Sequence, residues 1–183
     1  MIKKYFTINK KSIFLILAIL MSTITLGQST RTDRRILKDS KKAKIAFIKT
    51  DPSIKKWFDN AYGYVIFPNV GKAGLGVGGA FGKGIVYINN TPIGRAHLSQ
   101  LSVGFQAGAQ GYREVIFFEN KSNMDDFKEN KLQLSAQVSA VLVVLGAAAN
   151  INYSNGILIF TQPKGGLMYE ISVGGQSFNY EKF

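Results

Sequence analysis

Glycine alternates with apolar residues across the segment 63–111, and this pattern restricts the possible folds more than any other feature of the sequence. Twelve of the 19 glycines lie in this segment. Over residues 73–82, four apolar residues share one face of an extended chain while glycines occupy the other. Glycine weakens a strand unless another backbone passes close to it or the sheet bends sharply. The pattern therefore predicts a strongly coiled or barrel-like sheet, or a glycine surface packed against a helix.

Other stretches of the chain also follow the two-residue period of a β-strand. Tyr62 begins one of them, and Pro68 is expected to end it. The run 138–149 is apolar on both faces, and its length and β-branched content indicate a strand buried on both sides rather than a membrane helix. The predicted strands span residues 62–67, 73–82, 84–88, 101–110, 113–119, 132–145, 156–161, 167–173 and 176–180.

The segment that precedes these strands follows a helical period. Ile36, Ser40, Ala43 and Phe47 fall on one narrow face of a helix over residues 31–49. Basic residues repeat on the opposite face of the same helix. The pattern predicts an amphipathic helix that packs its apolar face on the body and presents a basic face to solvent.

Capping signals predict two further helices. Asp51 is a suitable N-cap and Pro52 a suitable first residue for a short helix directly after the basic one. Ser122 with Asp125 makes a capping box for a helix between two strands, and Phe127 is its apolar contact.

Residues 1–27 have the layout of a secretory signal peptide. Four lysines precede a short apolar run over residues 13–21, and small residues then offer a cleavage site. An uncleaved N-terminal anchor is the alternative.

The chain has no cysteine, which excludes disulfides, thiol catalysis and thiolate metal sites. Export without disulfides favours a bacterial periplasm or cell surface, and residues 28–183 are long enough for one domain.

Basic charge is concentrated at one end of the predicted domain. Residues 31–56 hold ten basic and three acidic side chains, whereas the residues after 56 hold nine basic and eight acidic ones. This polarity indicates an anionic partner, either a phospholipid surface or nucleic acid. Nucleic-acid binding asks for aromatic side chains among the basic ones, and Phe47 lies on the other face of the helix. A solvated charged face without a partner is the third interpretation.

Residue patterns for catalysis or cofactor binding are weak. The segment 74–79 has the letters of G-x-G-x-x-G, but a strand rather than a helix is predicted after it, so we expect no dinucleotide site. His97 is the only histidine, and no carboxylate cluster surrounds it in sequence. We therefore expect a protein that is not an enzyme, binds no metal or cofactor, and uses His97 only structurally.

Several motifs in order resemble the opening and central signature of the SYLF lipid-binding domain family, which is related to the yeast actin-binding SYLF proteins. The resemblance begins with the segment 66–74 and its following glycines, continues through 102–110 and 114–118, and ends near 164–167, where this chain has one additional glycine. It covers about residues 36–180. The signature residues that we assign to structure are Pro68, Gly71, Lys72, Gly74, Gly78, Gly79, Gly82, Gly84, Gln106, Gly108, Gln110, Lys164 and Gly165.

The resemblance implies binding to phospholipids, phosphoinositides in particular, through a basic N-terminal helix. The lipid-binding residues that it implies are Arg34, Arg35, Lys38, Lys41, Lys42 and Lys49. Fungal members also bind actin, but an exported bacterial-type member would not meet actin, so actin binding is not expected.

The sequence as a whole predicts an α+β domain, with a helical segment over 31–59 and a β-rich, mostly antiparallel body over 62–180. The predicted function is peripheral binding to an anionic phospholipid membrane surface from the periplasmic or outer side. The alternative is a protein-interaction or envelope-structural module whose glycine-rich sheet is only a scaffold.

Overall fold

The computed structural model describes residues 31–134, 140–166 and 175–183. The predicted signal peptide 1–27 and the predicted strand 167–173 lie outside the described residues. The chain divides into two units, residues 1–35 and residues 36–183, and each is described by itself. In the first unit, residues 31–35 are helical. The second unit contains the sheet.

Two long strands make up most of the second unit. β1 (Gly63–Ile88) and β2 (Thr91–Phe118) form an antiparallel hairpin whose register runs from the pair Gly63 and Phe118 to the pair Ile88 and Thr91. The hairpin turn is Asn89-Asn90, and both residues have positive φ, 49° and 61°. Asparagine tolerates this left-handed conformation, which matches the twist of the strands that a two-residue turn must join.

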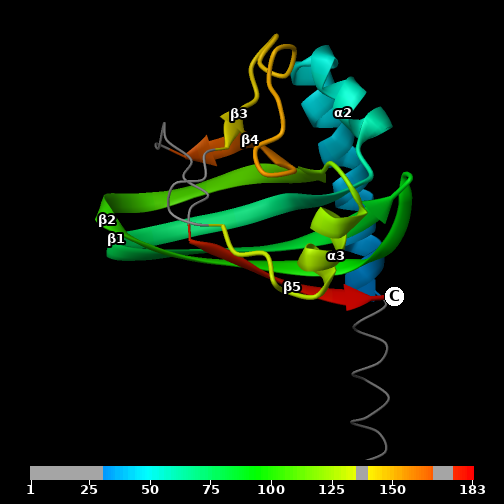
Figure 1. The fold of residues 1–183 in the computed structure, drawn as a ribbon. Helices are drawn as coiled ribbons and strands as arrows, with labels where there is room; N and C mark the ends of the chain where they lie inside the picture. The colour runs from blue at the N-terminus through cyan, green and yellow to red at the C-terminus, as the bar shows by residue number, and fades with distance from the viewer. Residues whose placement is uncertain (1–30, 135–139, 167–174) are drawn as a thin grey trace, which may run out of the picture. The chain divides into compact units, whose positions relative to one another are not determined.

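The other strands pair with different parts of β2. β4 (Ile157–Gly166) is antiparallel to its last part, and β5 (Gln176–Lys182) is antiparallel to its first part. β3 (Val141–Leu142) is parallel to β4. Figure 1 shows β4 and β5 along separate stretches of the β1–β2 ribbon. The predicted α+β class and mostly antiparallel sheet are confirmed, but the described sheet does not close into a barrel, so the barrel-like alternative is wrong.

Glycines in β1 allow two distant parts of this strand to approach closely. An ideal Cβ atom placed on Gly84 would lie 2.7 Å from the carbonyl oxygen of Ile66 and 2.7 Å from Cδ1 of Phe67. An ideal Cβ atom on Gly82 would lie 3.0 Å from Cγ2 of Val70. The close backbone approach that the glycine pattern predicts is therefore present at Gly84, where a side chain would collide with backbone.

Gly84→Ala should destabilise the protein, whereas Gly71→Ala should not. The added methyl group at Gly84 meets backbone that cannot move away cheaply, so we expect a loss of about 2 kcal/mol or more in the free energy of unfolding. A Cβ atom on Gly71 would meet nothing within 4 Å, which makes it the matched control. Urea denaturation of the two variants measures the difference, and equal stabilities would contradict the close approach.

Pro68 does not end a strand, contrary to the sequence prediction. Residues 62–67, 73–82 and 84–88 were expected as separate strands, but from Gly63 onward they belong to the single strand β1. The register of β1 against β2 shifts between Phe67 and Val70, and Pro68 lies inside this irregularity. A bulge is a place where a strand tolerates proline, because the ladder is already interrupted there.

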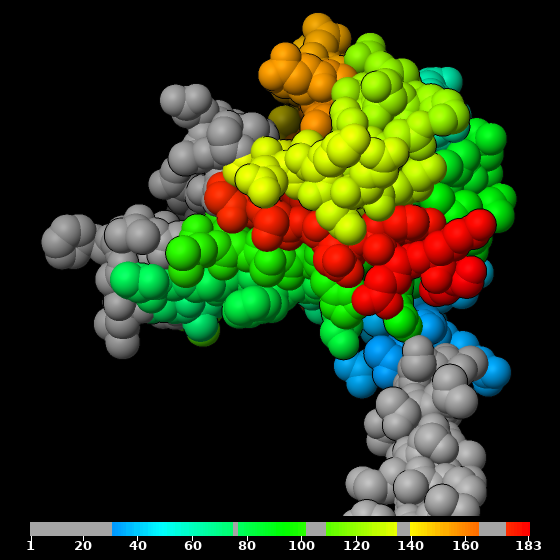
Figure 2. All heavy atoms as spheres, turned by 60° about the horizontal axis from the view of Figure 1, so that its bottom comes forward, coloured from blue at the N-terminus to red at the C-terminus, as the bar shows by residue number. Residues whose placement is uncertain are grey.

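Apolar side chains pack on both faces of the sheet. One cluster includes Phe67, Ile116, Phe127 and Phe178, and it lies beneath α3 and β5. Figure 2 shows β5, in red, alongside the yellow-green segment that begins with α3. The other cluster includes Phe47 and lies beneath the helix of residues 36–50. The sheet is therefore covered on both sides at residues 64–67 and 115–118, which explains the continuous apolar sequence of these two stretches.

The N-terminal helices form where the sequence predicts them. Helical residues extend through 50, and Ser40, Ala43 and Phe47 are buried as expected. The Asp51 side chain caps the 3₁₀ helix η1 (Pro52–Ile54) by accepting from the Ser53 N–H at 3.0 Å. The α-helix α2 (Lys55–Asn60) follows directly.

The cap of α3 (Lys121–Lys128) differs from the prediction. Asn120, not Ser122, is the N-cap, and its Oδ1 atom accepts from the Asn123 N–H at 3.1 Å. Asp125 instead forms ion pairs with Lys121 and with Lys128. Asparagine caps a helix as well as serine does, and Asn120 has the extended backbone that a cap requires.

The predicted strand 132–145 is wrong for most of its described residues. Within them only Val141–Leu142 form a strand, and residues 145–150 are turns. The apolar run 138–149 was expected to be buried on both sides, but Leu145 is 81 % exposed. Gly146 adopts a positive φ of 81°, which ends the extended conformation and turns the chain.

Candidate functional site

The six predicted lipid-binding side chains are all exposed. Arg34 and Arg35 belong to the unit that ends at residue 35, and both are exposed helical residues there. The others lie on the helix of the second unit, which is blue in Figure 1: Lys38, Lys41, Lys42 and Lys49. We call these four residues the basic helix face.

The opposite face of this helix is fixed to the sheet by apolar and polar contacts. The Ser40 hydroxyl lies 2.9 Å from the Tyr87 hydroxyl in a buried hydrogen bond. The Gln162 amide of β4 donates to the Thr50 hydroxyl at 2.6 Å. Phe47 is fully buried between these two contacts along the helix. The helix is therefore held in one rotation about its axis, which keeps the basic helix face toward solvent.

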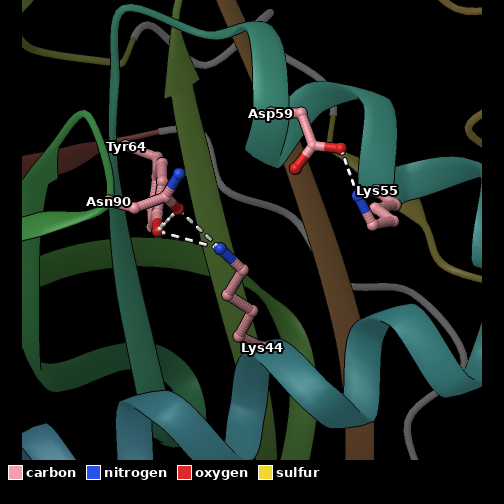
Figure 3. A network of polar contacts seen from close by, with 5 residues as sticks. All are labelled: Lys44, Lys55, Asp59, Tyr64 and Asn90. Carbon is pink, nitrogen blue, oxygen red and sulfur yellow. Dashed lines mark hydrogen bonds and ion pairs between the residues drawn. The ribbon is translucent and has the colours of Figure 1, made fainter.

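Lys44 belongs to the packed side of the helix, although it is basic. Its Nζ atom donates to Tyr64 Oη at 3.1 Å and to Asn90 Oδ1 at 2.7 Å (Figure 3). The same atom lies 4.6 Å from the centre of the Phe58 ring, a cation–π contact. Burial lowers the pKa of the Lys44 ammonium group. Lys44 thus joins the helix to the hairpin turn at Asn90.

Sequence reasoning missed this structural role of Lys44. The available signal was its position, four residues after Ser40 and three before Phe47, which places it beside the buried face of the helix. Figure 3 also shows the nearby ion pair of α2, in which the Lys55 ammonium lies 2.5 Å from the Asp59 carboxylate.

Four of the signature residues line one open pocket on the β1–β2 ribbon. The pocket has a volume of about 580 Å³, and Phe81, which is 70 % exposed, forms part of its wall. Lys72 and Gln110 are paired in register, and both are buried. The complete lining consists of Gly71, Lys72, Ala73, Gly79, Phe81, Ala109, Gln110 and Gly111. The structure therefore brings together signature residues that are up to 39 positions apart in sequence.

The remaining signature residues lie outside the pocket lining, at separate positions in β1, β2 and β4. An ideal Cβ atom on Gly74 would lie 2.4 Å from the Gly78 Cα atom, so the chain doubles back sharply between them. Gly108 pairs with Gly74, and Gly165 pairs with Gly111. The exposed Lys164 ammonium donates to the Asn69 side chain. Pro68, Gly82 and Gly84 lie in β1, and Gln106 lies in β2 with a side chain outside the described part of the structure.

A buried carboxyl group lies farther along β2. Glu114 is fully buried, and its Oε2 atom accepts from the Gln176 amide of β5 at 3.0 Å. Burial raises the pKa of Glu114 to about 7. Burial also raises the pKa of the neighbouring Tyr112 hydroxyl. Sequence reasoning assigned Glu114 no role, although a single acidic residue that opens the apolar run 114–118 is a signal of a buried carboxyl.

The described residues contain no group of three or more histidine, cysteine or acidic side chains that could hold a metal ion. His97 is partly exposed, and its Nε2 atom lies 3.8 Å from a Glu181 carboxylate oxygen. Within the described part of the chain, every helix is too short or too polar to cross a membrane. The prediction that this protein is not an enzyme stays a prediction.

The fold is an α+β domain with a folded-back glycine-rich ribbon, an open pocket on that ribbon and a docked basic helix. A family model of the SYLF domain, Ysc84, described as "Las17-binding protein actin regulator", matches residues 99–182. Beta cell expansion factor A from Aeromonas veronii is 28 % identical over 142 residues, which cover 76 % of this chain and 54 % of that protein. Both findings support the SYLF family, which is the family expected from the motifs. The match spans about half the length of this curated relative.

Proposed function

We propose that this protein binds anionic phospholipid at a membrane surface through its basic helix face. The observation that carries the proposal is the arrangement of four exposed lysines on a helix whose other face is fixed to the sheet. A fixed helix presents its charges together, so that they act on one surface. Each lysine near an anionic bilayer contributes roughly 1 kcal/mol, and this attraction weakens as salt is added.

Similarity to the SYLF family supports lipid binding as the class of function. The finer parts of the proposal are that the head groups are phosphoinositide-like, that the protein is exported to the periplasm or cell-envelope surface, and that it catalyses no reaction. The signal-peptide layout of residues 1–27 supports export. The alternative function is a protein-interaction or envelope-structural module. The matching family model is described as an actin regulator, which supports protein interaction as this second candidate.

Reversing three charges of the basic helix face should nearly abolish binding to anionic vesicles. In the variant Lys38→Glu, Lys42→Glu, Lys49→Glu, three attractive contacts are lost and repulsion is added, so we expect affinity to fall by roughly a hundredfold or more. All three side chains are exposed, so each substitution should change the free energy of unfolding by only about 0.5 kcal/mol. Vesicle co-sedimentation at low and high salt measures the affinity.

The matched control changes the net charge equally on other elements. Lys83→Glu, Lys131→Glu and Lys182→Glu replace exposed lysines of β1, of the segment after α3 and of β5. We expect this control to lose far less affinity for the same vesicles. If both triple variants bind as the parent does, the basic helix face is only a solvated surface. If binding ignores the anionic lipid content, the protein-interaction alternative is favoured.

A further inference from the structure

An apolar turn projects from the loop between β3 and β4. Val143 and Ala148 are buried and hold its two ends. The Val143 N–H donates to the Thr161 carbonyl of β4 at 2.8 Å. The Ala148 N–H donates to the Asp51 carboxylate at 2.7 Å. Although burial alone would raise it, hydrogen bonds from Ala148 and Ser53 hold the pKa of Asp51 below its usual value, so this anchor is charged at neutral pH.

Between these anchors, the side chains of Val144 and Leu145 point into solvent. Their exposed fractions are 55 % and 81 %, and the Leu145 value is the largest among the exposed large apolar residues of the described chain. The turn is closed by the Ala147 N–H, which donates to the Val144 carbonyl at 3.0 Å, and by the positive φ of Gly146. Holding leucine and valine side chains in water is unfavourable. An exposed apolar turn of this kind therefore indicates a surface that contacts lipid or another apolar partner.

Amphipathic aromatic residues lie at the base of this turn. The Trp57 indole N–H donates to the Ala148 carbonyl at 3.1 Å, and the Trp57 ring meets the Tyr153 ring edge-on with centroids 5.1 Å apart. Both side chains are partly exposed. Tryptophan and tyrosine favour the boundary between lipid tails and head groups, because one end of each ring is apolar and the other is polar.

Exposed lysines surround the same base. The Lys56 ammonium donates to the Ala149 carbonyl at 2.6 Å and lies 4.8 Å from the Trp57 ring centre. Lys55 is its neighbour, and Lys49 lies two residues before Asp51. The acidic groups nearby are Asp51, which is buried, and Asp59, which is ion-paired with Lys55. The net charge around the turn is positive and complements an anionic lipid surface.

We propose that this turn, residues 144–147, inserts into the apolar edge of an anionic phospholipid membrane. Val144 and Leu145 enter the lipid, Trp57 and Tyr153 lie at head-group level, and Lys49 and Lys56 contact the lipid phosphates. Figure 1 shows the yellow-to-orange loop beside α2, above the β1–β2 ribbon in this view, whereas β5 lies below the ribbon. The proposal rests on the proposed function and adds the surface that enters the membrane.

A fluorescent label on the turn tests insertion directly. The chain has no cysteine, so Leu145→Cys can be labelled at one position with an environment-sensitive nitrobenzoxadiazole dye. With vesicles of equimolar phosphatidylcholine and phosphatidylglycerol, we expect a blue shift and a several-fold rise in emission. Asp126→Cys, which places the label on the exposed face of α3, is the matched control and should show little change.

The outcomes separate this proposal from the proposed function. If the protein sediments with the vesicles and the label at 145 does not respond, the turn does not insert, while lipid binding stands. If no binding occurs, both proposals are wrong. If the label at 145 shifts with protein concentration in the absence of vesicles, the turn is a contact between copies of the chain and the membrane proposal is wrong.

Substitutions of Leu145 test the same proposal through the affinity for vesicles. Leu145→Glu removes the most exposed apolar side chain of the turn and adds a charge that lipid tails exclude. We expect vesicle affinity to fall by at least about tenfold, because burial of one leucine is worth at least that factor. Leu145→Met, which keeps an apolar side chain, should bind as the parent does. Equal affinities for Leu145→Glu and the parent would overturn the proposal.

Discussion

Phe47→Ala should lower the free energy of unfolding by about 3–5 kcal/mol, because a fully buried aromatic ring leaves a cavity between the helix and the sheet when it is removed. Phe47 belongs to the apolar cluster that also contains Ala43, Ile66 and Phe117. Truncation therefore affects the contact that fixes the rotation of the helix as well as the stability of the domain. Urea denaturation monitored by the Trp57 fluorescence measures the loss.

Ile45→Ala is the matched control on the same helix. Ile45 is apolar and is 66 % exposed, so its truncation should change the free energy of unfolding by no more than about 0.5 kcal/mol. Similar losses for the two variants would mean that the helix does not pack on the sheet in solution. The basic helix face would then have no fixed orientation, and its four lysines would act as a flexible arm.

Glu114→Gln should remove a pH-dependent loss of stability. The folded protein raises the pKa of Glu114 to about 7 because of burial, whereas a glutamate in an unfolded chain titrates near about 4.3. Between these values, the folded state holds a proton that the unfolded state has released. The contribution of Glu114 is therefore fully present below the unfolded pKa and is lost as the pH rises to about 7, with a total on the order of 3 kcal/mol.

Denaturation at two pH values measures this effect. The free energy of unfolding of Glu114→Gln minus that of the parent should be small at about pH 5 and should rise by about 2–3 kcal/mol at about pH 8. Glutamine keeps an oxygen that can accept from the Gln176 amide, and its side chain does not titrate. Glu119→Gln, at an exposed position just after β2, is the control and should show no such rise. A constant difference between Glu114→Gln and the parent would contradict a buried, titrating Glu114.

Local signals in the sequence predicted the helices well and the strand ends poorly. The Asp51 cap with Pro52 depends on two adjacent residues, and the structure contains it as predicted. The capping box at Ser122 failed because Asn120, two residues earlier, is an equally good cap. Pro68 failed as a strand end because the bulge that tolerates it depends on the register between β1 and β2, which the sequence does not contain.

The candidate site was predicted in part. The period of the helix placed the basic residues on a solvent-facing side, and the exposed Lys38 and Lys42 agree with it. Lys44 was assigned no role, because its partners Tyr64 and Asn90 reach it only through the hairpin. The pocket beside Phe81 could not be predicted from the sequence either, because it forms only when Gly71 and Gly111 pair in register across two strands.

The sequence by itself determined which segments are helical, which face of the first helix is buried, and that glycines must allow close packing somewhere in the long strands. These properties depend on the types of residues and their spacing along the chain, so helix propensity and hydrophobic periodicity are enough to predict them. Tertiary structure alone decided that Gly84 meets Ile66 and that the apolar run 141–149 becomes an exposed turn held by Asp51. An apolar run has the same letters whether a neighbouring element covers it or not, so its burial is decided only when the partners that could cover it are placed in space.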